Sequence, residues 1–267
     1  MGRHEVTGLE TLLDLTRVHN LGYVELVAAN PGVDPWLPAD GAKIVLPTAH
    51  LLPSGDQEGI TINLAEQRLY FFDPSEEGQV LSFPIGVSRE GWETPLGETR
   101  IIRKRAAPTW FPTASAREED PSLGRSVGPG PENPLGTHAL YLDWPTYLIH
   151  GTNEPDGVGR RVSRGCIRLY PEDIIRLFEI TPVETKVRVI HDPVKIARVG
   201  NEVYLEVHPT LEEMKLLEEE ARVEEIVPED LRERIKAAAG DATSRINWKL
   251  AYQTAAQRRG VPVLITR

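Results

Sequence analysis

The sequence has only one cysteine, Cys166, and this scarcity excludes several classes of site. A single cysteine cannot form an internal disulfide, and it cannot supply a C-x-x-C metal or redox motif. The sequence also lacks any run of about 20 apolar residues, the length that a membrane-spanning helix needs. We therefore expect neither a disulfide framework nor a transmembrane segment.

The sequence also has fewer basic than acidic residues. The chain carries 30 Lys and Arg against 40 Asp and Glu, which gives a formal net charge of -10. Because nucleic-acid binding requires a basic face that neutralises phosphates, we expect no nucleic-acid partner. The 267 residues are 40% apolar and 26% charged, a composition that allows a globular protein with a real core.

The first region has helical periodicity. Leucines recur at helical spacing in residues 9–18, and a second short helix is expected over Leu21–Asn30. Lys43–Pro47 has the pattern of a strand that ends at a proline. The Pro, Ser and Gly residues of Thr48–Gly59 indicate a linker. Residues 1–48 are therefore predicted to form a small helix-helix-strand module.

Short strand-like runs separated by turn residues fill the middle of the chain, a pattern that predicts a mostly antiparallel β domain over residues 59–191. The Pro- and Gly-rich segment Gly124–Gly136 is too irregular to be a helix or strand, and long loops of this kind are often functional. The predicted strands are Ile60–Asn63, Gln67–Phe72, Val80–Val87, Gly97–Lys104, Ala139–Leu142, Tyr147–Ile149 and Lys186–Ile190.

The last region changes to a helical pattern. Thr210 followed by Glu213 fits a capping box at the start of a helix. A final helix is expected to carry Trp248, Ala251, Tyr252 and Ala255 on one face. We predict an α+β protein with a helix-helix-strand module at 1–48, a sandwich-like, mostly-β domain at 59–191 and a helical extension at 200–267.

The stretch HGTNEPDGVGRRVSRGCIRL, residues 150–169, places His150 sixteen residues before Cys166. A cysteine attacks as its thiolate, so a catalytic cysteine needs a partner that accepts its proton, usually histidine. The oxyanion that forms needs backbone N–H groups held in a tight turn, and Gly165 permits such a turn. These residue types predict nucleophilic cysteine chemistry.

A plainer interpretation is that Cys166 is a buried apolar residue and His150 a hydrogen-bonded residue at the end of a strand. Free cysteine is among the most buried residue types. Arg164 and Arg168 flank the cysteine, however, and they suit a stabilised thiolate better than an apolar pocket. The glycine-rich segment before Cys166 also has no evident role in packing, so we favour the interpretation of Cys166 as a nucleophile.

At these residues the sequence resembles the L,D-transpeptidase catalytic domain of the YkuD type. The HGTN stretch that begins at His150, followed by SRGCIRL, is similar to the signature of that domain. TPLGETRI from Thr94 and NPLGTHALYL from Asn133 are similar to two other recurrent stretches. The resemblance covers roughly Gly59 to His191.

Residues 1–48 resemble a LysM module, which in that family binds the glycan of peptidoglycan. The match lies in ETLLDLTRVHNLGYVELVAANPGVD and in the closing KIVLP. The opening departs from the pattern, with His4 where an aromatic residue is usual and Leu9 where a glycine is usual. Glycan is thus an expected partner beside the stem peptides.

The resemblance implies a cysteine acyltransferase that acts on peptidoglycan tetrapeptide stems. Cys166 would attack the carbonyl between the L-centre of a diamino acid and the terminal D-alanine, and D-alanine would leave. A second stem or a lipoprotein lysine would then take the acyl group from the thioester. His150 would transfer protons, oriented by Gly151. The turn at Arg164 and Gly165 would stabilise the oxyanion. Ser163, Arg168 and Asn153 would bind the substrate.

The resemblance also implies inhibition by carbapenems and no cofactor or metal. The other histidines show no ligand spacing and are expected to be ordinary surface or packing residues: His4, His19, His50, His138, His191 and His208. Four aromatic residues could line a peptide cleft, although a tryptophan in a β domain is more often in the core: Trp92, Trp110, Trp144 and Tyr147.

Several other functions were weighed against this one. A sortase-like enzyme has its arginine on a separate strand, unlike the close spacing of Cys166 and Arg168, and papain-type peptidases place histidine after the cysteine. An L,D-carboxypeptidase and a non-catalytic peptidoglycan-binding protein remain alternatives. The activity implies the periplasm or cell-wall space. The first thirty residues have no apolar signal segment, so we expect that a leader has been removed.

Overall fold

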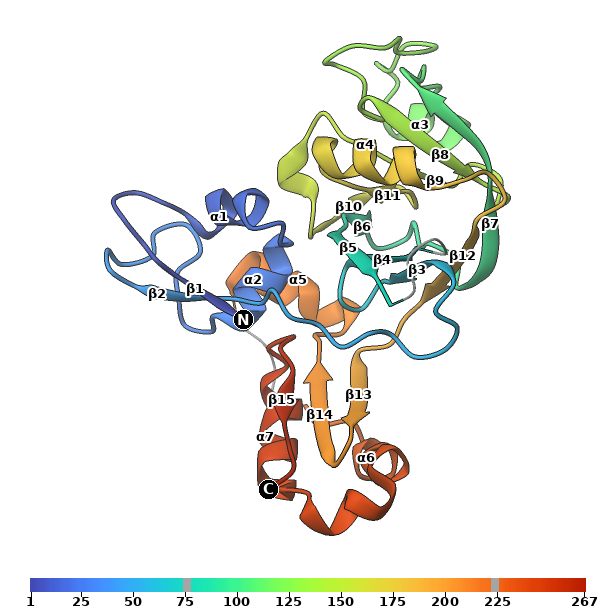
Figure 1. Ribbon diagram of the computed structural model, residues 1–267. Coiled ribbons are helices and arrows are strands. Elements are labelled where there is room, and N and C mark those ends of the chain that lie inside the picture. Colours follow the sequence, from blue (N-terminus) through green and yellow to red (C-terminus); the bar gives the residue numbers. More distant parts are fainter. Residues whose placement is uncertain (74–77, 222–225) are drawn as a thin grey trace. The chain divides into compact units, whose positions relative to one another are not determined.

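The computed structural model describes residues 1–73, 78–221 and 226–267. The chain divides into two compact units (Figure 1). The first consists of Met1–Gln57, Asn63–Gln67 and Ile190–Arg267, and the second of Glu58–Ile62 and Arg68–Val189. Every residue proposed above for catalysis or substrate binding lies in the second unit. The first unit contains both the N-terminal and the C-terminal part of the chain.

The second unit is organised by an eight-stranded sheet with the order β11-β9-β8-β7-β12-β3-β4-β5 (Figure 1). Each strand predicted in the middle of the chain is present, and the main pairings are antiparallel, as expected. Alternating apolar residues and clear turn signals explain this agreement. The predicted strands correspond to β3 (Gly59–Asn63), β4 (Arg68–Phe72), β5 (Val80–Pro84) with β6 (Val87–Ser88), β7 (Gly97–Ala106), β8 (His138–Leu142), β9 (Leu148–His150) and β12 (Lys186–Ile190).

Two very short strands around the cysteine pair in parallel. Strand β10 (Arg161–Ser163) lies beside β6, and β11 (Ile167–Arg168) lies beside β9. Runs of two or three residues are too short to show alternation, so the sequence could not reveal them. The unit also contains α3 (Ala114–Glu119), η1 (Pro155–Gly157) and α4 (Pro171–Ile180). Residues 124–136 form no helix or strand beyond the isolated bridge of Val127 to Trp110.

The N-terminal part of the first unit has the predicted helices and strand. Helix α1 (Leu12–Val18) is followed by α2 (Tyr23–Ala29) and by β2 (Lys43–Leu46). An additional strand, β1 (Gly2–Glu5), pairs antiparallel with β2. Its sequence, GRHE, has no apolar side chain, although Gly2 and His4 are half-buried, which explains why hydrophobic patterning could not predict it.

The C-terminal part contains the expected helices and, in addition, a sheet. Helices α5 (Leu211–Glu220), α6 (Leu231–Ala239) and α7 (Trp248–Gln257), with η2 (Gly240–Arg245), accompany a three-stranded sheet of β13 (Val194–Val199), β14 (Glu202–Val207) and β15 (Val263–Leu264). The predicted capping box is present, since Thr210 N–H donates to a Glu213 carboxylate oxygen at 2.7 Å. The extension is therefore a mixed α/β region with two of its strands inside residues 200–267.

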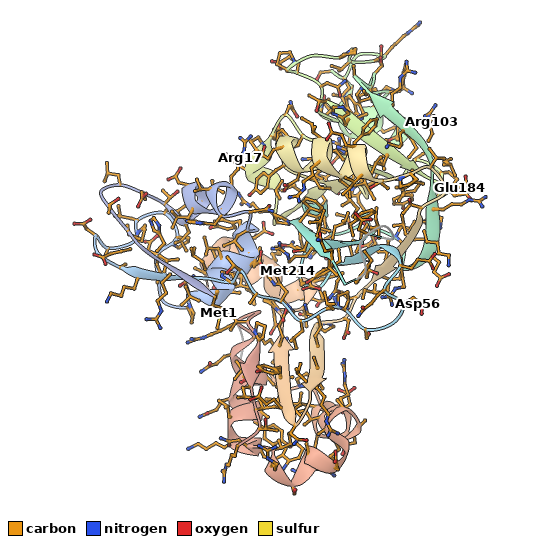
Figure 2. All side chains as sticks on the ribbon, viewed as in Figure 1. Met1, Arg17, Asp56, Arg103, Glu184 and Met214 are labelled. Carbon is orange, nitrogen blue, oxygen red and sulfur yellow. The ribbon has the colours of Figure 1, made fainter. Side chains whose placement is uncertain are left out.

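Helix α5 explains why both ends of the chain share one unit. Met214, labelled in Figure 2, and Leu217 are buried with Leu12, Leu26 and Ile44 in a single apolar cluster. A separate cluster packs α6 and α7 against β13–β15. Helix α5 of the predicted C-terminal extension thus packs with the N-terminal module. Among the residues that the structure describes, no helix is both long and apolar enough to span a bilayer.

Candidate active site

Cys166 lies in a tight turn between β10 and β11. The preceding Gly165 has a φ of +102°, and a Cβ at that position would lie 2.9 Å from Cε1 of Tyr147. Two hydroxyl groups fix the turn: Ser163 Oγ donates to the carbonyl oxygen of Cys166 at 2.6 Å, and Thr94 Oγ1 donates to that of Gly165 at 3.0 Å. Only glycine fits the conformation and the space at position 165.

These two hydroxyl contacts change one expectation and add one residue. Ser163 was expected to bind substrate, but its side chain is buried and its proton is used inside the turn. Its contact supports a positioning role. Thr94 is also buried, and sequence reasoning gave it no role, although it begins the TPLGETRI stretch that carries part of the family resemblance.

His150 ends β9, and β11 runs parallel beside it. The register pairs Ile149 with Ile167 and His150 with Arg168. Because Cys166 immediately precedes Ile167, it lies next to Leu148, whose backbone N–H donates to the thiol sulfur. This short parallel pairing brings together two residues that lie sixteen positions apart in the sequence.

The imidazole of His150 is held in one tautomer. Nδ1 lies 2.5 Å from the carbonyl oxygen of Gly151, and a carbonyl can only accept, so Nδ1 carries the proton and Nε2 keeps its lone pair. The side chain is buried. Burial, together with the positive charge of Arg168, lowers the pKa of His150 from 6.5 to about 3, although the Gly151 hydrogen bond opposes the change. At neutral pH the group is therefore an uncharged base.

The cysteine is also neutral at rest. Its side chain is half-buried, and Sγ donates to the carbonyl oxygen of Thr146 at 3.5 Å. Burial raises the pKa of the Cys166 thiol, while the Leu148 N–H and the charge of Arg168 partly offset that change. The flanking arginines suit a thiolate, as expected from the sequence, but burial has the larger effect on the pKa of the resting thiol. The thiol must lose its proton during attack.

The two arginines beside the cysteine have different environments. Arg164 is exposed, and its Nε donates to a carboxylate oxygen of Glu119 in α3 at 2.8 Å. Glu119 also pairs with Arg89, and these two hydrogen bonds lower the pKa of its carboxyl group. Arg168 is more buried, and its Nη1 lies 3.8 Å from the carboxylate of Glu154. The Arg164 side chain is thus engaged by Glu119, whereas the charge of Arg168 acts on both His150 and Cys166.

Two grooves open beside these residues. One, of about 420 Å³, is lined by Asn153, Thr152 and Asn133 among others. The other, of about 580 Å³, is lined in part by Trp144 and Tyr147, which form an edge-to-face pair with ring centroids 6.2 Å apart. Asn153 and this aromatic pair therefore lie where peptide could bind. Trp92 and Trp110 are outside the residues that line these two grooves.

A second cluster of polar residues lies in the first unit. Ligand atoms of His50, Glu66 and Glu206 all lie within 4.8 Å of one another, the one such group with metal-ligand chemistry among the described residues. Lys195 Nζ lies 2.5 Å from Glu66 and 2.7 Å from Glu206, and His208 Nε2 lies 2.6 Å from Glu206. We call these five residues the buried ion network. Its ammonium group already supplies the positive charge that a metal would bring, so we do not interpret it as a metal site. His50, which also lies 3.4 Å from a Glu25 carboxylate oxygen, and His208 are thus packed among carboxylates, a more specific role than the packing residues that the sequence predicts.

Comparison with known proteins agrees with this chemistry. The family model of the YkuD L,D-transpeptidase catalytic domain matches residues 57–189. The Escherichia coli protein named "Probable L,D-transpeptidase YbiS" is 39% identical over 251 residues, which cover 92% of this chain and 80% of that protein. The chain belongs to the L,D-transpeptidase family. The likeness extends well beyond the catalytic domain.

A second relative shows the same relationship. The Salmonella typhimurium protein named "Probable L,D-transpeptidase ErfK/SrfK" is 40% identical over 252 residues, 92% of this chain and 79% of that one. Among solved structures, an L,D-transpeptidase from Mycobacterium smegmatis aligns over 50% of this chain and 58% of that chain, at 20% identity and a TM-score of 0.41.

Proposed function

We propose that this chain is a cysteine L,D-transpeptidase that acts on peptidoglycan tetrapeptide stems. The observation that carries the proposal is the neutral His150, with Nδ1 held by the Gly151 carbonyl oxygen, next to strand β11, which Cys166 immediately precedes. A neutral thiol and a neutral imidazole are suited to proton transfer that is concerted with attack on a carbonyl.

In the first half of the reaction, Sγ of Cys166 bonds to the carbonyl carbon between the diamino acid and D-alanine. His150 Nε2 takes the thiol proton and gives it to the departing amine of D-alanine as the C–N bond breaks. The oxyanion is stabilised by backbone N–H groups of the turn at Arg164, Gly165 and Cys166. The product of this half is a thioester and free D-alanine.

In the second half, an amine attacks the thioester, and His150 Nε2 takes a proton from that amine and gives it to the sulfur as the C–S bond breaks. A second stem would give a cross-link between third residues, a lipoprotein lysine would give an anchored protein, and water would give carboxypeptidase activity. Arg168 and Asn153 are the proposed substrate contacts, because the first places charge beside the dyad and the second lines a groove.

The N-terminal module is proposed to bind peptidoglycan glycan. Two loops of this module present exposed apolar side chains, Leu9 before α1 and Trp36 between α2 and β2, and Trp36 also lies 5.7 Å from the buried Tyr23 ring. Aromatic faces of this kind suit sugar rings. Glycan and stem substrates imply a location in the periplasm or cell-wall space.

The direct test is mass spectrometry of tetrapeptide muropeptides after incubation with the purified protein, beside a Cys166→Ala control. We expect dimers joined through third residues, with loss of D-alanine, and no such products with the variant. Tripeptide alone would indicate a carboxypeptidase under these conditions. Products that form equally with Cys166→Ala would refute cysteine catalysis.

A further inference from the structure

The groove of about 580 Å³ leads away from the nucleophile. Thr146 is one of the residues that line this groove, and its carbonyl oxygen accepts the hydrogen bond from Cys166 Sγ. Its lining also includes Leu148, Tyr141 and Arg103, and Figure 2 labels Arg103 on β7. A peptide whose carbonyl lies at Cys166 therefore has a continuous surface along which it can extend toward Arg103.

The strand register sets the length of this surface. Arg103 on β7 pairs with Tyr141 on β8, Tyr141 pairs with Leu148 on β9, and the N–H of Leu148 donates to the sulfur of Cys166. These four residues thus form a row across neighbouring strands. Strands lie about 4.8 Å apart, so the backbone of Arg103 lies about 14 Å from that of Cys166.

The Arg103 guanidinium is held in a position that suits anion binding. Its central carbon lies 3.9 Å from the centroid of the Tyr141 ring, a stacking contact that orients the plane and leaves the N–H groups at its edge available. Arg103 is exposed, and no carboxylate pairs with it in the described part of the chain. The acidic lining residue Asp143 pairs instead with Arg100, at 3.5 Å.

Geometry identifies which anion this guanidinium could hold. Because the guanidinium lies over the Tyr141 ring on β8, two strand spacings separate the guanidinium from Cys166, a distance of about 10 Å. In the stem, the residue before the diamino acid is linked through its side-chain carboxyl, so its free carboxylate lies seven bonds, at most about 9 Å, from the scissile carbonyl carbon. A charge-assisted hydrogen bond adds about 2.8 Å, which gives a total reach of up to about 12 Å. A carboxylate on the residue that precedes the diamino acid falls at this distance from the scissile carbonyl.

We propose that Arg103 is a specificity-determining residue that binds the free carboxylate of the stem residue preceding the diamino acid. This inference rests on the proposed function for the identity of the peptide. Stems that carry a free carboxylate at that residue bind in this groove, and stems in which the carboxylate is amidated bind more weakly. Arg103 takes no part in the transfer of protons or acyl groups.

The test measures binding without turnover. In the full chain carrying Cys166→Ala, NMR titration compares the tetrapeptide L-Ala-γ-D-Glu-meso-diaminopimelyl-D-Ala with its D-isoglutamine analogue. We expect the free-carboxylate peptide to bind about tenfold more tightly, the effect of one charge-assisted hydrogen bond. Adding Arg103→Gln should reduce that preference to about one. The matched control is Arg105→Gln, an exposed arginine two residues along β7 and outside the groove lining, which should retain the preference.

Three results would overturn the inference: equal affinity for the two peptides when Arg103 is present, a preference that survives Arg103→Gln, or no binding of either peptide. Failure of the proposed function is seen separately, as an absence of cross-linked or trimmed muropeptides with the unmodified protein. The binding comparison uses a chain without its nucleophile, so it stands whatever the outcome of that reaction.

Discussion

The active site and the buried ion network each place a basic side chain out of water, and their neighbours decide what each can do. His150 faces the positive charge of Arg168 and a backbone carbonyl, and its pKa falls to about 3. Lys195 faces two carboxylates. Burial by itself would lower the pKa of Lys195, but the charges of Glu66 and Glu206 raise it above its ordinary value.

The difference between the two sites shows when a buried base serves the reaction and when it serves the stability of the fold. A buried base without a counter-charge stays neutral and keeps a lone pair for chemistry. A buried base between carboxylates stays charged, and its removal leaves two uncompensated negative charges. We therefore expect changes at His150 to act on the reaction, and changes at Lys195 to act on folding.

The largest effect is expected at Lys195. Replacing it by methionine leaves the buried carboxylates of Glu66 and Glu206 without the ammonium group that faces them. Breaking a buried ion pair of this kind destabilises a protein by about 3–5 kcal/mol. Calorimetric unfolding should show this loss. The control Lys186→Met removes an ion pair with Glu58 whose side chains are 69% and 61% exposed, and it should change the free energy of unfolding by less than about 1 kcal/mol. Similar effects of the two substitutions would contradict the account of the network.

Next in size is the effect of removing the base. His150→Ala should slow acylation of Cys166 by about 10²-fold or more, because no group then accepts the thiol proton. The rate of adduct formation with imipenem, followed by intact mass, measures this step. His208→Ala, which removes one of the two histidines of the buried ion network, should leave the rate unchanged at a temperature where the variant is folded. A loss in both variants would show that the effect comes from folding.

A smaller effect is expected for Gly165→Ala. The substitution places a side chain at a φ of +102° and a Cβ 2.9 Å from the Tyr147 ring, so the turn must shift, and acylation should slow by about tenfold, as for a donor weakened in an oxyanion site. Gly91→Ala is the control, since Gly91 has a φ of +81° with nothing within 4 Å of an added Cβ. Equal losses of activity in the two variants would show that backbone strain alone is responsible.

The smallest change is expected on varying the pH. His150 has a folded pKa of about 3, below its ordinary 6.5, so it stays deprotonated and able to accept a proton at every pH above about 3. The rate of acylation by imipenem should therefore be nearly flat between about pH 5 and pH 8. A rate that falls to half its maximum near pH 6.5 on acidification would mean that His150 titrates as an ordinary histidine.

The sequence predicted elements with strong periodicity and missed those without it. Strands β3 and β4 have apolar alternation or continuous apolar runs and were placed almost to the residue. Strands β10 and β11, which form the nucleophile turn, are too short to leave a pattern. Strand β15 pairs with β14 across nearly sixty positions, which local patterning cannot show. Strands β13 and β14 form a local hairpin, which the sequence interpretation missed.

For the site, the sequence identified Cys166 and His150 through chemistry and spacing, and the contact with Gly151 through the family resemblance. It could not show that burial keeps the thiol protonated, because burial depends on the packing of distant strands. It also gave no role to Thr94 or Glu119, whose contacts with the turn come from residues 71 and 45 positions away.

The most direct test of the central claim is acid-quenched intact mass spectrometry of the protein mixed with the synthetic tetrapeptide. The account predicts an adduct on Cys166 equal in mass to the tetrapeptide acyl group without D-alanine, formed as D-alanine is released. It should be absent from Cys166→Ala and delayed in His150→Ala. Release of D-alanine with no adduct on Cys166, or its undiminished release by Cys166→Ala, would contradict the account.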